Sequence, residues 1–152
     1  MGILYTANFN ASVTNTKNTL LQLTASSSVP IRITRVSLTS ALTAATAQRV
    51  QLVRLGTGTT AMTAGTAVKL NLLSPTASTT VGTWVSTQTE GSTVTVLLER
   101  TLDLRAGAGF DYLPIPGSEI IVPVSGVFAL YLPVVLAGTS ALSGEVEWAE
   151  SI

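Results

Sequence analysis

The chain of 152 residues has the length of one ordinary domain, and it carries eight basic and eight acidic side chains but no histidine and no cysteine. The missing histidine and cysteine exclude disulfide bonds, thiolate nucleophiles, cysteine metal sites and the commonest general base of enzymes. The balanced charge contains no basic run, so it argues against nucleic-acid binding, which needs a basic patch.

The first third of the chain consists of short segments with strand character. Alternating side chains predict strands at Ile3–Asn10, Thr19–Ala25, Val29–Thr39 and Arg49–Leu55. In the third of these, the alternation of apolar side chains shifts by one residue between Ile33 and Val36. This shift predicts a β-bulge near Thr34–Arg35. The segment Ser40–Gln48 lacks the apolar face of a helix, so we predict a loop with at most one helical turn.

Residues 56–80 differ from their surroundings, because they are rich in Gly, Thr and Ser and almost free of charge. Only Val68–Leu73 within them has an ordered pattern, which predicts a short strand or turn inside a long excursion. Loops of this length in compact domains are usually functional or flexible, and we expect this one to make a contact.

Strand signals resume in the second half of the chain. They predict strands at Val81–Thr89, Thr93–Leu104, Glu119–Val124, Val127–Val135 and Ser140–Glu150. The second of these alternates most cleanly, with one face formed by Val94, Val96, Leu98, Leu102 and Leu104. Arg100 shares that apolar face, which indicates the edge of a sheet. The prolines of Phe110–Gly117 exclude that segment from a central strand.

The pattern of about eight to ten short strands without helices predicts an all-β, antiparallel β-sandwich in a single domain spanning 1–152. We favour a jelly roll over an immunoglobulin-like sandwich, because the strong strands are separated by a large excursion and the Cys-Trp-Cys pattern is absent. We expect no membrane span, because the longest apolar run contains Pro133 and is far shorter than the required length of roughly 20 residues.

The carboxylates do not predict catalysis. On a strand face, Glu99 and Asp103 would stand about 13 Å apart, which is too far for a glycosidase pair. Glu145 and Glu147 would stand about 7 Å apart, but a solvated outer face explains them better. We therefore expect no enzyme activity, catalytic residue, cofactor or metal.

Four aromatic residues admit two interpretations, a platform for stacking sugars or anchors of the core and of interfaces: Trp84, Tyr112, Tyr131 and Trp148. We favour anchors. Charged residues make up 11 % of the chain, against about 25 % in a typical domain, and 24 Thr and 15 Ser take their place. Such a surface is either coated with hydroxyl groups or covered by other subunits.

The interface residues that we predict come from both termini and from the aromatic-proline segment. Terminal strands of jelly rolls often pair across subunits by strand addition, and the alternative is that they fray. The candidates are Ile3, Leu4, Tyr5, Phe9, Phe110, Tyr112, Leu113, Pro114, Ile115, Trp148 and Ile152.

Several segments of the chain resemble small β-sandwich proteins encoded among the structural genes of tailed bacteriophages, some of which are capsid decoration, or cement, proteins. The segments are Ile3–Phe9, Val50–Arg54, Gly109–Pro116, Leu132–Pro133 and Ala141–Trp148. The resemblance implies a homotrimer of jelly rolls on the outside of the virion, at local threefold positions, where it clamps neighbouring subunits of the major capsid protein. Residues 56–80 match no such pattern.

Two other functions remain open at this point. The first is a carbohydrate-binding or receptor-binding module of a phage fibre or tail, which would need exposed aromatic side chains around a concave site. The second is another virion structural protein, such as a major capsid jelly roll, for which this chain is short.

Overall fold

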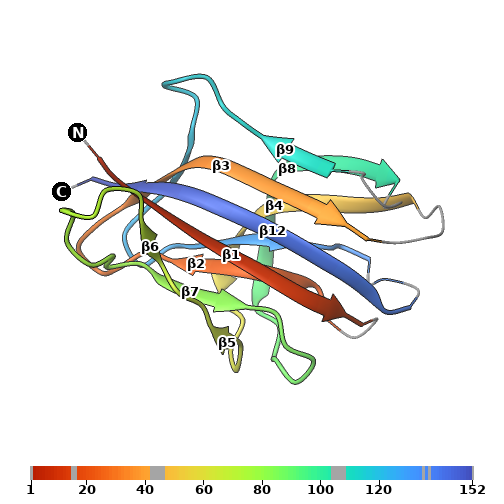
Figure 1. Ribbon diagram of the computed structural model, residues 1–152. Helices are drawn as coiled ribbons and strands as arrows, with labels where there is room; N and C mark the ends of the chain where they lie inside the picture. Colours follow the sequence, from red (N-terminus) through yellow and green to blue (C-terminus); the bar gives the residue numbers. More distant parts are fainter. Residues whose placement is uncertain are drawn as a thin grey trace.

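The computed structural model describes residues 2–14, 17–41, 47–103, 109–134, 136 and 138–151. Twelve strands lie within these residues and form two antiparallel sheets that pack against each other (Figure 1). The predicted all-β sandwich is therefore confirmed. The segments 42–46 and 104–108 lie outside the described residues. The first of them makes up most of the predicted Ser40–Gln48 loop.

The first sheet has the strand order β10-β3-β12-β1-β6, and β9 pairs with β3 on the same side as β10. Its strands are β1 (Ile3–Val13), β3 (Ile31–Ser40), β6 (Val68–Lys69), β9 (Gly109–Tyr112), β10 (Ile120–Val122) and β12 (Ser140–Glu150). Strands β1 and β12 pair along their whole length, from Ile3 opposite Glu150 to Val13 opposite Ser140. The two terminal strands thus pair with each other inside one chain, and β12 has strand partners on both sides. Pairing of the terminal strands across subunits stays a prediction.

The second sheet has the strand order β5-β7-β2-β11-β4-β8. Its strands are β2 (Thr19–Thr24), β4 (Ala47–Thr57), β5 (Thr63–Ala64), β7 (Thr80–Thr83), β8 (Ser92–Asp103) and β11 (Val127–Tyr131). Strand β8 lies at the edge of this sheet, as the position of Arg100 predicts. The excursion at 56–80 contains β5 and β6, which add to different sheets.

The core between the sheets is built around an aromatic pair. The rings of Tyr5 and Trp148 stack with their centroids 5.8 Å apart, and both side chains are fully buried. Aliphatic side chains from both sheets surround this pair, because alternate residues of each strand point inward. Burial of such large side chains supplies most of the favourable free energy of folding.

A β-bulge interrupts β3 at the predicted place. Glu147 pairs with Arg35 and Trp148 pairs with Ile33, so Thr34 is the extra residue of β3. The bulge moves the inward-facing positions by one residue, and Ile33 and Val36 are therefore both buried.

A second bulge, in β8, was not predicted. Leu52 pairs with Leu98 and Val53 pairs with Val96, which leaves Leu97 as the extra residue. The predicted single apolar face of β8 is therefore wrong. Val94 and Val96 are exposed, whereas Leu98 and Leu102 pack against the core.

Strand β7 is shorter than the predicted Val81–Thr89, because a turn begins after Thr83. The side-chain oxygen of Gln88 accepts a hydrogen bond from the backbone N–H of Val85. Its side-chain amide donates to the carbonyl of Thr19. The local bond to Val85 and the distant bond to Thr19 together hold residues 85–88 in a turn, in place of further strand pairing.

Candidate interaction surface

The structure divides the described members of the predicted interface residues into buried, exposed and half-buried groups. Tyr5, Phe9, Phe110 and Trp148 are buried in the core of a single chain, so they are not available to another molecule, and this part of the prediction is corrected. Leu4, Leu113 and Ile115 are exposed. Ile3, Tyr112 and Pro114 are half-buried, and Ile152 lies outside the described residues.

The most exposed of the predicted residues lie in the connection between β9 and β10, residues 113–118, which we call the apolar tip. Both flanking strands pair with β3, so the connection has to leave the sheet and project from its edge (Figure 1). The side chains of Leu113 and Ile115 are 75 % and 77 % exposed. Exposure of two neighbouring large aliphatic side chains on a protruding turn is typical of a contact surface.

Hydrogen bonds and prolines hold the apolar tip in one conformation. Ser118 donates from its backbone N–H and from its hydroxyl to the carbonyl of Ile115, at 3.0 and 2.8 Å. The N–H of Gly117, which has a φ of 92°, donates to the carboxylate of Glu119. At the base, the N–H of Ile120 donates to the hydroxyl of Tyr112. The apolar side chains are therefore presented on a preorganised turn.

A second exposed apolar segment follows β6. It lies in the excursion that we expect to make a contact, but none of its residues is among the predicted interface residues. We call residues 70–73 the leucine turn. Leu72 and Leu73 are 90 % and 94 % exposed, more than any other large aliphatic side chains among the described residues. The signal in the sequence is a pair of adjacent leucines inside an excursion that is almost free of charge and that we expect to make a contact.

The leucine turn is anchored at both ends. The N–H of Leu70 donates to the carbonyl of Leu4, and Asn71 accepts hydrogen bonds from Leu73 and from Ser74. Beyond the turn, the hydroxyl of the buried Tyr5 donates to the carbonyl of Pro75, at 3.0 Å. The exposed leucines thus belong to a fixed part of the molecule.

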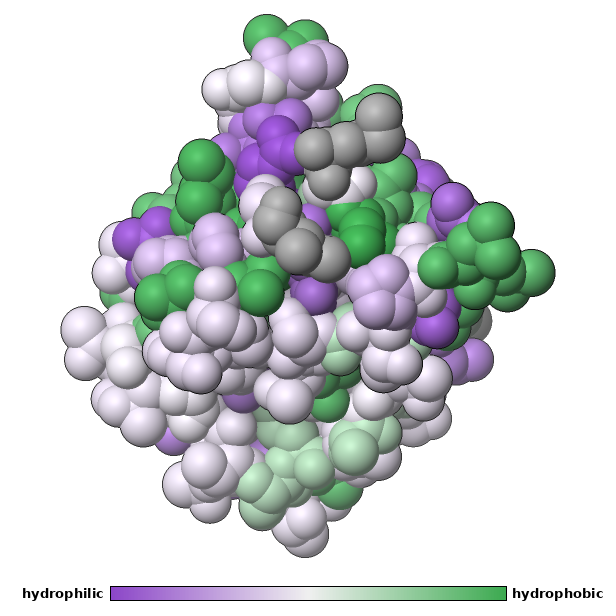
Figure 2. All heavy atoms as spheres, turned by 90° about the vertical axis from the view of Figure 1, so that its left-hand side faces the viewer, coloured by the Kyte–Doolittle hydropathy of each residue, from purple (hydrophilic) through white to green (hydrophobic). Residues whose placement is uncertain are grey.

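A hollow of about 330 Å³ lies beside the leucine turn and is lined by Gly2, Ile3, Leu4, Leu70, Asn71 and Ser74. Figure 2 looks onto this end of the sandwich, where both termini lie, and hydrophobic atoms stand out at its upper and right-hand margins. The apolar tip and the leucine turn therefore both expose large aliphatic side chains to solvent.

The carboxylate of Glu150 fastens the segment that follows the leucine turn. It accepts hydrogen bonds from the backbone N–H groups of Ser78 and Thr79 and from the hydroxyl of Ser78. Burial alone would raise the pKa of Glu150, but the hydrogen bonds outweigh burial, and the pKa lies below its ordinary value. Glu150 therefore acts as an ionised structural anchor.

Glu90 plays the same part between β7 and β8. It accepts hydrogen bonds from the N–H and the hydroxyl of Thr19, from the N–H of Asn18 and from the side chain of Gln88. Burial alone would raise the pKa of Glu90. The hydrogen bonds from Thr19, Gln88 and Asn18 lower the pKa by more than burial raises it, so the pKa lies below its ordinary value. These donors occupy the carboxylate of Glu90, whereas the carboxyl group of a catalytic acid has to be free to contact its substrate.

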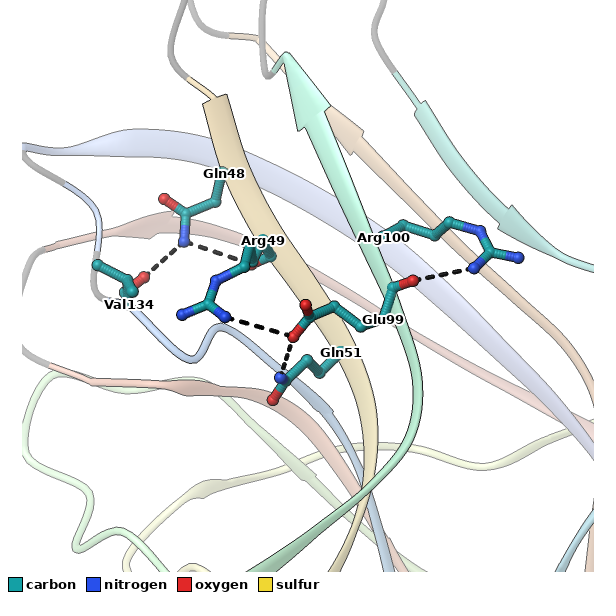
Figure 3. Close-up of polar contacts among 6 residues, drawn as sticks. All are labelled: Gln48, Arg49, Gln51, Glu99, Arg100 and Val134. Atoms are coloured by element: carbon teal, nitrogen blue, oxygen red, sulfur yellow. Dashed lines mark hydrogen bonds and ion pairs between the residues drawn. The ribbon is translucent and has the colours of Figure 1, made fainter.

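The face of β4 and β8 is polar around Glu99 (Figure 3). Gln51 donates a hydrogen bond to the carboxylate of Glu99, and a guanidinium nitrogen of Arg49 lies 3.7 Å from the same oxygen. On the other sheet, Glu145 accepts a hydrogen bond from Thr6, and Glu147 pairs with Arg35 at 3.5 Å. Each of these carboxylates has a cross-strand partner, as expected for charged groups on the outside of sheets.

The four aromatic residues of the sugar-platform hypothesis do not come together. Trp148 lies in the core, and Tyr112 lies at the edge of the first sheet. Tyr131 and Trp84 belong to the second sheet and to the turn after β7, and both are only half-buried. The ring contact found for these four is the stacking of Trp148 on Tyr5.

A polar hollow of about 440 Å³ lies on the first sheet and is lined by Asn8, Phe9, Asn10, Ser37, Thr39, Ser143, Gly144 and Glu145. Its amides, hydroxyl groups and carboxylate could bind the hydroxyl groups of a ligand. Phe9 is buried, so the hollow has polar donors and acceptors without an exposed aromatic ring.

No protein-family model matches the chain, and neither the curated proteins nor the solved structures contain a match. In the described part of the chain, no three acidic, histidine or cysteine side chains converge as a metal site would require. The same residues contain no helix of the length and hydrophobicity needed to cross a bilayer.

Proposed function

We propose that the protein is a virion structural protein that acts through its surface, decorating and stabilising a phage capsid by binding between neighbouring capsid subunits. The exposure of Leu113, Ile115, Leu72 and Leu73 on two fixed, uncharged turns is the observation that carries this proposal. A free monomer gains nothing from presenting such side chains to water, whereas an assembly protein buries them against its partners.

The order of strands supports the jelly roll that belongs to this proposal. Eight strands pair in a nested way, β1 with β12, β2 with β11, β3 with β9 and β4 with β8. Such nesting is expected when one long double-stranded ribbon is rolled into two Greek keys. In this arrangement β5, β6 and β7 are an insertion between the fourth and fifth strands of the roll.

The low charge of the chain supports contacts on more than one side. A decoration protein buries one surface against its own copies and another against the shell, and such permanent interfaces are apolar. We propose a homotrimer that binds the major capsid protein on the exterior of the virion. Many copies would stabilise the shell together even if each contact were weak.

Co-sedimentation tests this proposal. The purified protein is mixed with immature and with expanded capsids of the virus that encodes it, and bound protein is measured after pelleting. The proposal expects saturable binding to expanded capsids and a higher temperature of capsid disruption. A protein that remains a monomer and pellets with neither form of capsid would overturn it.

The polar hollow on the first sheet favours a second candidate, a carbohydrate-binding or receptor-binding module of a fibre or tail. Two asparagine side chains and Glu145 provide both donors and acceptors for sugar hydroxyl groups. A glycan array separates the two candidates. Binding that is lost in Asn8→Ala and Asn10→Ala would favour the second, and an array without hits would favour capsid decoration.

A further inference from the structure

We infer that the apolar tip of one copy of this chain docks into the hollow beside the leucine turn of a second copy. The inference rests on the proposed function, because it names the contact that would hold the homotrimer together. The apolar tip and the hollow cannot meet within one chain, because β9 and β10 lie at one edge of the first sheet and β6 lies at the other.

The two features have complementary shapes. The apolar tip is a protrusion that carries Leu113 and Ile115 on a turn braced by hydrogen bonds to Ile115 and Glu119. The hollow is a depression of about 330 Å³ whose lining includes Ile3, Leu4 and Leu70. Because both halves are already ordered in the single chain, docking costs little conformational entropy.

The charges that flank the two features are also complementary. Lys69 precedes the leucine turn, and Glu119 follows the apolar tip. Among the described residues, neither of them forms a close ion pair, and Arg32 of the same chain attracts Glu119 from a longer distance. Docking of a tip into a hollow brings opposite charges together, whereas a contact of tip with tip would bring two copies of Glu119 together.

These observations identify a second copy as the occupant, because the protrusion and the depression with their opposite charges are encoded in the same sequence. A contact between two different patches is heterologous, and repetition of such a contact gives a closed ring when the rotation closes. Three copies would close the proposed trimer.

Chemical cross-linking tests the contact without any capsid present. The chain has no cysteine, so Ile115→Cys and Leu70→Cys introduce unique thiols. With a short bismaleimide, the double variant is expected to give covalent oligomers, and a mixture of the two single variants is expected to give heterodimers. Each single variant alone should cross-link no more than Thr101→Cys, which is exposed on β8. Efficient cross-linking of either single variant, or none in the pair, would overturn the inference.

Charge reversal gives a second readout. Lys69→Glu and Glu119→Lys are each expected to weaken self-association at least about tenfold, and the double reversal should recover most of the loss. Circular dichroism verifies that the variants fold, and failure of the double reversal to recover association would count against the contact. Absence of the cross-link and of any effect of charge reversal, in a protein that still binds capsids, would reject this inference alone, whereas a wild-type ring that ignores capsids would reject the proposed function alone.

Discussion

The hydroxyl of Thr19 donates a hydrogen bond of 2.6 Å to the carboxylate of Glu90, which joins the start of β2 to the residues that precede β8. The backbone N–H of Thr19 and the side chain of Gln88 donate to the same carboxylate. One ionised side chain thus fixes the connection between β7 and β8 against the start of β2.

Replacement of Glu90 by glutamine should therefore destabilise the fold. The neutral amide is a weaker acceptor, and its NH₂ group would face the donors of Thr19 and Asn18. We expect a loss of about 1–3 kcal/mol in the free energy of unfolding, measured by urea denaturation. Asp111→Asn is the matched control, because the exposed pair of Asp111 with Arg35 should contribute less than about 1 kcal/mol. Equal effects of the two substitutions would contradict the structural role of Glu90.

Stability should fall in acid because of Glu90 and Glu150. Folding lowers the pKa of both carboxyls, so the folded state binds fewer protons than the unfolded state. Their contribution is complete above the pKa of an unfolded glutamate, about 4.3, and is lost as the pH drops from there through the lower folded pKa. Urea midpoints measured between about pH 3 and pH 7 test this. The slope should be shallower in Glu150→Gln, and an unchanged slope would show that Glu150 does not titrate with folding.

Trp148 and Leu113 should respond in opposite ways to truncation. Trp148→Ala removes the centre of the core and should cost about 3–5 kcal/mol, whereas Leu113→Ala should change the stability of the monomer by less than about 0.5 kcal/mol. Thermal unfolding measures both. A stable Trp148→Ala variant would mean that this side chain serves an outer surface, as the sugar-platform hypothesis requires.

Gly91 lies close against the backbone of residues 57–59. A Cβ atom at this position would stand 2.1 Å from the carbonyl oxygen of Thr57. Gly91→Ala should therefore destabilise the protein by about 1–3 kcal/mol. Gly138→Ala is the control, because nothing lies within 4 Å of a Cβ at Gly138. Equal melting temperatures of the two variants would contradict the close approach of Gly91 to the backbone of Thr57.

The sequence predicts the sandwich well, because alternation of side chains reports directly which face of a strand is buried. The bulge at Thr34 could be found because it shifts that alternation within one strand. The bulge at Leu97 could not, because Val96, Leu97 and Leu98 are all apolar and conceal the shift. The turn after Thr83 depends on the side chain of Gln88, which contacts residues far away in the sequence.

The interaction surface was predicted less well than the fold. Hydrophobicity shows that a side chain will be buried, but it does not show whether the same chain or a partner buries it. Tyr5 and Trp148 were therefore predicted to be interface residues although they stack in the core. Leu113 and Ile115 could be placed on the surface of the chain, because the neighbouring prolines keep them out of a central strand. Leu72 and Leu73 carry no comparable local signal.

Native mass spectrometry of the purified protein tests the central claim most directly. The claim is that the exposed apolar turns bury themselves against other copies of the chain. At micromolar concentrations, the wild-type protein should appear as one closed oligomer, a trimer, and the folded double variant Leu113→Ser/Ile115→Ser should appear as a monomer. A wild-type protein that remains monomeric over this range, or a double variant that keeps the wild-type mass, would contradict the account.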